Sequence, residues 1–213
     1  MGRPFCISSR QYDIIVGTLF GDGRLECRSK RCTARLRVHH CAKQKALVFW
    51  KYKKLRNLVS TGPRRIHSWV NPRNKKKHYS WYFHTKTFAD LGLLYNMFYI
   101  NGKKRLPEKT ENILNPLMLA VWYMDDGSRD RQNIILNTQN FEYFEQEKLQ
   151  KIFRQKYKMK TYIVKDRDKF RLYFDKRSSE EFLSVIKDEI ISSFRYKLVP
   201  VTTEPKGEAS YNK

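Results

Sequence analysis

Acidic residues are scarce in this sequence. Its 213 residues include 21 Asp and Glu against 44 Lys and Arg, which gives a formal net charge of +23. The excess is concentrated, because residues 24–77 hold 18 Lys or Arg and a single acid, Glu26. Charge of one sign repels itself in a folded chain unless a polyanion neutralises it. The composition therefore predicts a nucleic-acid partner, and it argues against a basic surface that only confers solubility.

Long apolar runs are also absent. None approaches the roughly 20 residues that a membrane span needs, so we expect no membrane segment. The N-terminal stretch MGRPFCISSRQYD lacks the long apolar core of a secretory signal. We therefore expect an intracellular protein.

Cysteine is confined to the first fifth of the chain. The four residues are Cys6, Cys27, Cys32 and Cys41. This clustering does not fit a disulfide framework for the whole fold, and it favours reduced thiols. A zinc site built from Cys27, Cys32 and Cys41 with His39 and His40 stays open, although the spacing matches no standard zinc motif.

The order of features occurs twice, which indicates a duplicated unit. In residues 1–107 an apolar stretch, IVGTLFGDG (residues 15–23), ends on Asp22, and in residues 108–213 a second stretch, LAVWYMDDG (residues 119–127), ends on Asp126. Each half then carries alternating apolar and polar segments and closes on Lys-x-x-Pro, beginning at Lys104 and Lys197. We therefore predict an α+β fold of two related halves, with boundaries at residues 1–107 and 108–213.

Local patterns predict the individual elements. In the first half we expect a helix over 12–20 with a capping box at Ser8 and Gln11, a hairpin over 24–39, a helix over 43–58, a basic loop, a strand over 80–85 and a helix capped by Thr87 and Asp90. In the second half we expect a helix starting at Asn115 and Pro116, a strand over 133–138, a helix over 140–157, a hairpin over 161–174 and a helix capped by Ser178 and Glu181.

Asp22 and Asp126 lie at the C-terminal ends of their predicted helices, where a carboxylate is unfavourable for helix stability. A helix C-terminus carries partial negative charge and free carbonyl groups, so an added carboxylate destabilises it slightly. A hard divalent cation reverses this effect, because it binds both carboxylate and carbonyl oxygens. If the two helices pack side by side, the pair can hold Mg²⁺ against a phosphate and promote phosphodiester cleavage.

The two stretches resemble the paired motifs of the LAGLIDADG homing endonucleases, of the single-chain intron-encoded type. NPLMLAVWYMDDG, the following IILNTQ and the late YKLVP carry the resemblance, which covers nearly the whole chain. It implies two αββαββα halves with saddle-shaped antiparallel sheets over DNA and the two motif helices packed at the centre. It also implies a monomer that makes a site-specific double-strand break by Mg²⁺-dependent hydrolysis, with Mn²⁺ as a substitute, and so promotes intron mobility.

The same resemblance implies roles for single residues. Asp22 and Asp126 would bind the metal, helped by the carbonyls of Gly21 and Asp125. Lys104 and Lys197 would act beside the hydrolytic water. Two alternatives stay open, since Asp125 could replace Asp126 at the metal and Lys103 could replace Lys104.

DNA contacts follow from the strand alternation and the basic loop. Arginine pairs bidentately with guanine, whereas lysines mostly fix the backbone. Two unequal halves imply a non-palindromic duplex of about two helical turns. The predicted DNA-binding residues are Arg24, Arg28, Arg35, Arg37, His39, Lys43, Lys45, Arg64, Arg65, Lys75, Lys76, Lys169, Arg171 and Tyr173.

A rival function comes from the same resemblance. Some LAGLIDADG proteins act as maturases, which bind their intron RNA and assist splicing, with or without nuclease activity. The basic surface fits both functions equally. The paired Asp22 and Asp126 favour the nuclease, because an RNA chaperone has no need of them.

Overall fold

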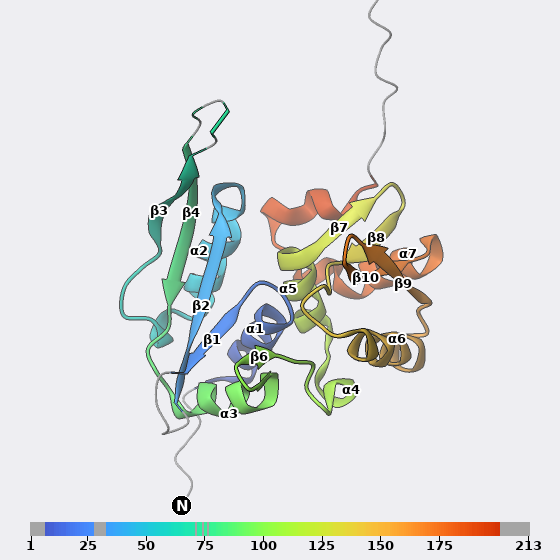
Figure 1. Cartoon of the computed structure of the whole chain (residues 1–213), viewed down its shortest axis with the longest axis horizontal. Coiled ribbons are helices and arrows are strands. Elements are labelled where there is room, and N and C mark those ends of the chain that lie inside the picture. The colour runs from blue at the N-terminus through green and yellow to red at the C-terminus, as the bar shows by residue number, and fades with distance from the viewer. Residues whose placement is uncertain (1–6, 28–32, 71, 74, 76, 201–213) are drawn as a thin grey trace, which may run out of the picture.

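The structure is a computed structural model, and it describes residues 7–27, 33–70, 72–73, 75 and 77–200. Its elements form two similar runs (Figure 1). The first run is α1 (Ser9–Phe20), β1 (Arg24–Cys27), β2 (Ala34–Cys41), α2 (Lys45–Lys54), β3 (Arg64–Val70), β4 (Lys77–His84), α3 (Ala89–Phe98), β5 (Tyr99–Ile100) and β6 (Lys103–Lys104). The second is α4 (Thr110–Ile113), α5 (Pro116–Asp126), β7 (Gly127–Asp130), β8 (Asn133–Leu136), α6 (Tyr143–Tyr157), β9 (Thr161–Asp166), β10 (Lys169–Phe174) and α7 (Lys176–Ile186). Short 3₁₀ helices are η1 (Ala42–Gln44), η2 (Arg56–Leu58), η3 (Lys187–Glu189) and η4 (Ser192–Leu198).

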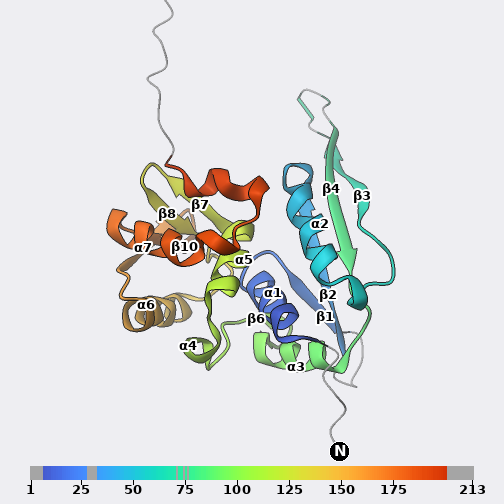
Figure 2. The ribbon, with the colours of Figure 1, turned by 180° about the vertical axis from the view of Figure 1, so that it is seen from behind.

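Each run builds a four-stranded antiparallel sheet with the same connectivity. The strand orders are β1-β2-β4-β3 and β7-β8-β10-β9. Helices α2 and α3 pack against the first sheet, and α6 and α7 pack against the second. Figures 1 and 2 show α1 and α5 together in the centre, between the two sheets. The predicted α+β duplication is confirmed, whereas the exact division after Pro107 stays a prediction.

The two central helices begin at the caps that the sequence predicts. Ser8 Oγ accepts a hydrogen bond from the Gln11 amide, and Gln11 Oε1 accepts one from the Ser8 amide, at 3.3 and 3.2 Å. This capping box satisfies two of the amides that a helix start leaves free. On α5, Asn115 Oδ1 accepts from the Met118 amide at 2.9 Å, and Pro116 occupies the first turn.

The contact between α1 and α5 is asymmetric. A Cβ atom at Gly17 would lie 2.7 Å from the Met118 carbonyl oxygen and 2.8 Å from Val121 Cβ, so only glycine fits at this crossing. The aligned position on α5 is Val121, which fills the space that Gly17 leaves. Further along, Phe20 stacks on Trp122 with ring centroids 5.1 Å apart. The small residues of one helix therefore accept the larger side chains of the other.

The segment Arg64–Val70 corrects the predicted basic loop. It is strand β3, which pairs antiparallel with β4 from Arg64 opposite Tyr82 to Val70 opposite Lys77, with an irregularity between His67 and Trp69. The many charged residues in this region make the alternation of a strand hard to recognise in the sequence. Its Ile, Trp and Val residues nevertheless favour a strand once β4 offers a partner.

Two helix caps and one helix length are also corrected. Asp175, rather than Ser178, caps α7, because its Oδ1 accepts from the Ser178 amide at 2.8 Å. Helix α3 follows Phe88 and has no side-chain cap, so Thr87 does not play that role. The helix expected over 43–58 is divided into η1, α2 and η2. Within the part of the chain that the structure describes, no helix has the length and apolar character of a membrane span.

Candidate active site and nucleic-acid interface

Asp22 and Asp126 come together at the C-terminal ends of the two central helices. Their carboxyl groups lie within hydrogen-bonding reach of each other. Asp126 is the last residue of α5, and Asp22 follows Gly21, whose amide donates to the Gly17 carbonyl as α1 ends. The Asp22 side chain is 45% exposed and therefore open to a ligand. The structure thus joins the two carboxylates that end the repeated motifs.

The electrostatics of the pair are unequal. Burial raises the pKa of Asp126 to about 8, and the nearby carboxylates of Asp22 and Asp125 add to this shift. Burial also acts to raise the pKa of Asp22, but contacts with His40 and the charge of Lys51 outweigh it and hold that pKa below its usual value. Two carboxylates this close do not both ionise readily without a cation. Without metal, Asp22 is therefore the ionised member and Asp126 retains a proton near neutral pH.

The two predicted lysines lie in matched positions under these helix ends. Lys104 Nζ donates to the carbonyls of Gly21 and Gly23, both at 2.8 Å. Lys197 Nζ donates to the carbonyls of Met124 and Gly127 at 2.8 Å, and to that of Tyr123 at 3.1 Å. Each ammonium group therefore caps the helix of its own half, where the carbonyls carry partial negative charge.

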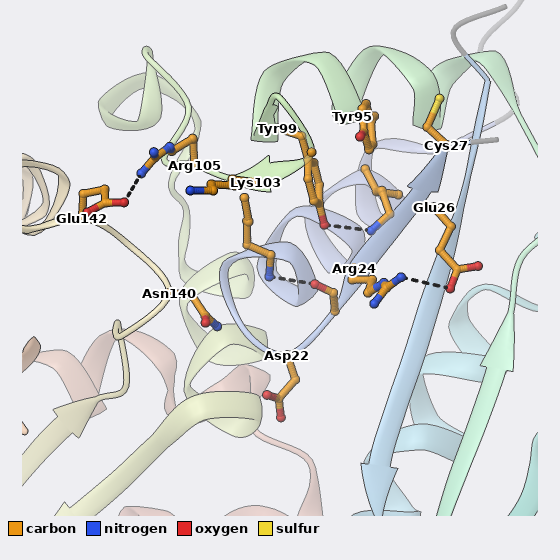
Figure 3. A pocket seen from close by; sticks show the side chains of 14 residues that line it. Asp22, Arg24, Glu26, Cys27, Tyr95, Tyr99, Lys103, Arg105, Asn140 and Glu142 are labelled. Atoms are coloured by element: carbon orange, nitrogen blue, oxygen red, sulfur yellow. Dashed lines mark hydrogen bonds and ion pairs between the residues drawn. The ribbon is translucent and has the colours of Figure 1, made fainter. Parts of the chain in front are cut away.

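Burial lowers the pKa of both lysines to about 8, and the nearby aspartates offset part of this effect. The open alternative, Lys103, is exposed on β6. It lines a cavity of about 800 Å³ beside Asp22. In Figure 3, Lys103 lies on the side of this cavity away from the Asp22 carboxylate. The geometry therefore favours Lys104 over Lys103 as the lysine at the helix end.

The Asp125 side chain points into the protein interior, which bears on the second open alternative. Its carboxylate accepts hydrogen bonds from Lys51 Nζ at 2.6 and 2.7 Å, and both side chains are 0% exposed. His40, 1% exposed, has Nε2 3.4 Å from Asp125 Oδ1 and Nδ1 3.4 Å from Asp22 Oδ2. The inward orientation of Asp125 leaves the Asp126 carboxylate beside Asp22.

The sequence analysis missed Lys51 and assigned His40 only to a zinc alternative. A signal existed for both. Lys51 lies four residues after Leu47 and four before Leu55, on the apolar face of a helix. His40 has the same parity in its strand as the apolar Leu36 and Val38, which predicts an inward side chain.

The donors at the helix ends fit a hard divalent cation. They comprise the carboxylates of Asp22 and Asp126 and nearby carbonyl groups, which are oxygen ligands that Mg²⁺ prefers. A divalent cation would also remove the repulsion that raises the Asp126 pKa. Among the residues that the structure describes, no three or more His, Cys, Asp or Glu side chains are arranged to hold a metal. A bound ion would therefore take further oxygen ligands from water or a phosphate.

The zinc alternative gains no support from this geometry. His39, His40 and Cys41 alternate across β2, so His40 is buried while Cys41 is exposed. Cys27 is half-buried on β1. Cys6 and Cys32 lie outside the described residues.

The face of the first sheet opposite its helices carries the predicted arginines. In β2 the buried Ala34, Leu36 and Val38 alternate with the half-buried Arg35, Arg37 and His39. Arg24 of β1 lies opposite Arg37, so its side chain projects from the same face. Tyr82 and His84 of β4 lie opposite His39 and Arg37 and belong to this face as well. The alternation proposed for the first half agrees with the structure.

Glu26 organises the cations of this face. Arg35 Nη2 lies 2.7 Å from its carboxylate, and Arg24 and Arg37 each lie 3.8 Å away. Burial alone would raise the Glu26 pKa, but the hydrogen bond and charge of Arg35 lower it below its usual value. The one acid in the basic region therefore fixes the arginines in place. The sequence did not predict this role for Glu26, because the residue stood out only as the single acid among many basic residues.

The remaining first-half candidates divide between the two faces of the sheet. Arg64 lies opposite Tyr82 and shares its face, whereas Arg65 lies opposite Trp81 and its guanidinium packs 3.7 Å from the Tyr79 ring centroid. Lys45 Nζ lies 4.8 Å from the Trp81 ring centroid on the helix side. Arg65 and Lys45 therefore lie away from the predicted DNA face, because neighbouring strand residues point in opposite directions. Lys43 and Lys75 are exposed, and Arg28 and Lys76 lie outside the described residues.

The second sheet presents a less basic face. In β10 the predicted Lys169, Arg171 and Tyr173 alternate with Phe170, Leu172 and Phe174, of which Leu172 and Phe174 are fully buried. Arg171 lies 3.9 Å from Asp166, which also accepts a hydrogen bond from Gln139 at 2.7 Å. Asn133 Nδ2 donates to Tyr173 Oη. The two sheets therefore offer different side chains at equivalent places.

Comparison with known proteins identifies this arrangement. Residues 12–182 match the LAGLIDADG DNA endonuclease family. The chain belongs to that family. DNA endonuclease I-ChuI of Chlamydomonas applanata is 29% identical over 208 residues, which span 90% of this chain and 95% of the relative. Cytochrome b mRNA maturase bI2 of Debaryomyces hansenii is 27% identical over 196 residues, which span 90% of this chain and 74% of the relative.

A solved structure shares the LAGLIDADG fold. The homing endonuclease I-WcaI bound to its DNA recognition sequence superposes with a TM-score of 0.84 at 21% identity. The match covers 93% of this chain and 89% of the other. The family and the fold class predicted from the sequence are confirmed by these relationships. Membership of a DNA endonuclease family supports the predicted nuclease activity.

Proposed function

We propose that this LAGLIDADG protein is a site-specific homing endonuclease that cuts both strands of a long, non-palindromic DNA site and thereby promotes intron mobility. The main support is the meeting of the Asp22 and Asp126 side chains at the ends of two central helices, between two sheets with polar faces. A scissile phosphate at this point would lie close to both carboxylates, and the sheets would contact the duplex on either side.

Each aspartate would serve the cleavage of one strand. Asp22 and Asp126 would hold the divalent cations on which LAGLIDADG endonucleases generally depend, Mg²⁺ here with Mn²⁺ as a substitute. The metal would supply an activated water and stabilisation of phosphate charge. The Gly21 and Asp125 carbonyls are the proposed helpers. The Gly21 carbonyl also accepts from Lys104, so it would be shared between the two partners.

Lys104 and Lys197 would act on the phosphate or on the attacking water. The ammonium group of each lysine is held by carbonyl groups at the end of the motif in its own half. These contacts fix the distance between each ammonium group and the carboxylates. A pre-positioned cation stabilises developing negative charge without reorganising during the reaction. The same carbonyl contacts explain how the half-buried Lys104 and the buried Lys197 are retained beside helix ends.

The DNA would lie along the faces of the two sheets. Arg24, Arg35, Arg37 and Arg64 supply most of the positive charge on the first face, and Lys169 and Arg171 supply it on the second. Because the two faces differ, they would read different half-sites over about two helical turns. One chain carries both halves, so a monomer would suffice. We further propose an intracellular location, in an organelle or a prokaryotic cytoplasm.

An intron maturase is the second candidate, and a specific observation supports it. A cytochrome b mRNA maturase aligns over 90% of this chain. An intron RNA would bind the basic surface by the same phosphate contacts that suit DNA. The two functions differ in their need for Asp22 and Asp126, because RNA binding requires neither carboxylate.

One experiment separates the two candidates. The purified protein is incubated with Mg²⁺ and a plasmid that carries the intronless junction of the host gene, and both cut positions are mapped. Paired cuts near the junction support the endonuclease. No cleavage in Mg²⁺ or Mn²⁺, combined with accelerated splicing of the host intron RNA, would support the maturase and refute the endonuclease.

A further inference from the structure

The ammonium group of Lys51 is completely buried, which is rare for lysine. It lies on the inner face of α2, between Leu47 and Leu55, and both of these leucines are fully buried. Its partner, Asp125, comes from α5 of the other half, and the Nζ group contacts both carboxylate oxygens at 2.6 and 2.7 Å. A buried ion pair often stabilises a fold no more than apolar residues of the same volume. Its presence therefore suggests a role other than stability.

The contacts continue from this pair to the catalytic carboxylates. His40 Nε2 lies 3.4 Å from Asp125 Oδ1, and His40 Nδ1 lies 3.4 Å from Asp22 Oδ2. Neither ring nitrogen meets the geometry of a hydrogen bond to any residue within the described ranges, so these two contacts are electrostatic. The Asp22 carboxyl group in turn meets that of Asp126. A chain of polar side chains thus runs from Lys51 through Asp125 and His40 to Asp22.

The network joins residues of both halves, and within the described ranges it has no counterpart at the equivalent positions of the repeat. Helices α2 and α6 begin at Lys45 and Tyr143, so Lys51 and Leu149 are both seventh in their helices. Leu149 is fully buried, which shows that an apolar residue fills the equivalent position without loss of packing.

The other two members of the network, His40 and Asp125, also have residues of a different type at their equivalent positions. Arg24 and Ser128 are equivalent, because each lies two residues after the aspartate of its motif. Arg24 pairs with Arg37 and Ser128 pairs with Ile135, so Arg37 and Ile135 are equivalent as well. His40 and Thr138 each lie three residues further along and are therefore equivalent. Asp125 aligns with Gly21, where a Cβ atom would lie 2.5 Å from Asp125 Cβ. The glycine of the first motif therefore makes room for the aspartate of the second.

We propose that Lys51, Asp125 and His40 form an asymmetric positioning network that holds the Asp22 and Asp126 carboxylates in place and supports the two strand-cleaving centres unequally. This inference rests on the proposed endonuclease function. Lys51 holds the Asp125 side chain in the protein interior, which leaves Asp126 to face Asp22. His40 restrains Asp22 directly. Because the equivalent positions of the repeat, Leu149, Thr138 and Gly21, cannot form the same contacts, the two strands are cut at different rates.

The test separates positioning from stability. Lys51→Met or Asp125→Leu alone leaves one buried charge unpaired and destabilises the protein. The double variant Lys51→Met with Asp125→Leu removes both charges, so its melting temperature returns toward that of the wild type. We expect its cleavage rate to stay about 10²-fold lower, since small misplacements of reacting groups have effects of this size. DNA affinity is expected to stay unchanged, and the ratio of the two strand-cleavage rates to shift.

Three further variants sharpen the result. Ser179→Ala removes a buried hydroxyl that accepts from the Ile134 amide at 2.9 Å and donates to the Phe174 carbonyl at 3.2 Å, and neither partner belongs to the network. This variant should lower stability without changing cleavage or strand order. His40→Leu should slow cleavage, and His40→Gln should partly restore it because glutamine keeps a hydrogen-bonding group. Calorimetry of Mg²⁺ binding to the protein on a duplex with non-hydrolysable scissile linkages should show weaker binding for the double variant.

A double variant that regains stability, binds Mg²⁺ normally and cuts both strands at the wild-type rates and ratio would overturn the positioning role. Failure of the wild type itself to cut DNA would refute the proposed endonuclease function, and the positioning role with it. The wild-type reaction therefore distinguishes the two failures.

Discussion

The carboxyl groups of Asp22 and Asp126 lie within hydrogen-bonding reach, although the two residues end different helices in different halves of the chain. The packing of α1 against α5 brings them together, and this packing depends on Gly17. Their proximity has a consequence for charge, since burial and the neighbouring carboxylates raise the Asp126 pKa to about 8. A divalent cation and a phosphate complete a site that is unfavourable for the protein alone.

Removing either carboxylate should abolish double-strand cleavage. Asp22→Asn or Asp126→Asn keeps the side-chain shape but removes a metal-binding charge, so we expect the rate to fall about 10³-fold or more while DNA binding persists. Supercoiled plasmid cleavage and a gel-shift assay measure the two effects. Asp188→Asn, at an exposed acid on η3, serves as the matched control. Continued cutting of both strands by both variants in Mg²⁺ would contradict the assignment.

The contribution of Asp126 to stability without metal should fall as the pH rises. The Asp126 pKa is about 8 in the folded protein and 3.8 in the unfolded reference, so the folded state binds the proton more tightly. This contribution is fully present below pH about 3.8 and is lost as the pH rises through about 8. In EDTA, the melting temperature of the wild type should therefore fall relative to that of Asp126→Asn between pH about 5 and about 9.

Added Mg²⁺ should reverse that loss at high pH, because the ion binds the deprotonated carboxylate and so stabilises the folded state. Differential scanning fluorimetry across the pH series measures both effects. Parallel curves for the wild type and Asp126→Asn, with and without Mg²⁺, would show that the carboxyl group is not perturbed.

The lysines at the helix ends should affect the chemical step more than binding. Lys104→Met or Lys197→Met removes a fixed cation beside the carboxylates, and we expect kcat to fall about 10²-fold with little change in DNA affinity. Single-turnover kinetics on a mapped target duplex provides the measurement. Lys103→Met is the matched control, since Lys103 is adjacent in sequence but exposed. An equal loss in the Lys103 variant would reassign the role.

Gly17 should tolerate no larger residue. In Gly17→Ala the new methyl group would lie 2.7 Å from the Met118 carbonyl oxygen, so the two central helices must separate. Overpacking of this kind typically destabilises by about 1–3 kcal/mol, which corresponds to a melting temperature lower by several degrees in a chain of this size. Gly62→Ala is the control, because its nearest contact would be Tyr52 Oη at an ordinary 3.5 Å. Equal melting temperatures for the two variants would show that the helices have room to adjust.

DNA affinity should depend steeply on salt. Each neutralised phosphate contributes a slope of about −0.9 to the plot of log affinity against log salt concentration, so several contacts give a slope of several units. Arg37→Ala should weaken binding, because its guanidinium projects from the face of the first sheet. Arg177→Ala should not, since that 89% exposed side chain lies on α7. Fluorescence anisotropy over a salt series tests both expectations, and a nearly flat salt dependence would refute the proposed interface.

The local elements of the central helices were predictable from the sequence. Ser8 with Gln11 and Asn115 with Pro116 are short-range signals, because a cap and its helix lie within a few residues of one another. The alternation in β2 and β10 is equally local and placed Arg35, Arg37 and Arg171 on one face. Strand β3 escaped prediction because its stability depends on pairing with β4, which charge and composition do not reveal.

By itself the sequence determined the charge, the repeated motif and the positions of Asp22 and Asp126 at helix ends. Only the tertiary structure decided which side chains meet there. Asp125 and Asp126 are neighbours of the same type, yet one is paired with Lys51 and the other faces Asp22. The difference arises from packing between the halves, where α2 supplies a cation and Gly21 supplies space. Contacts of that kind join residues far apart in the chain, so no local pattern encodes them.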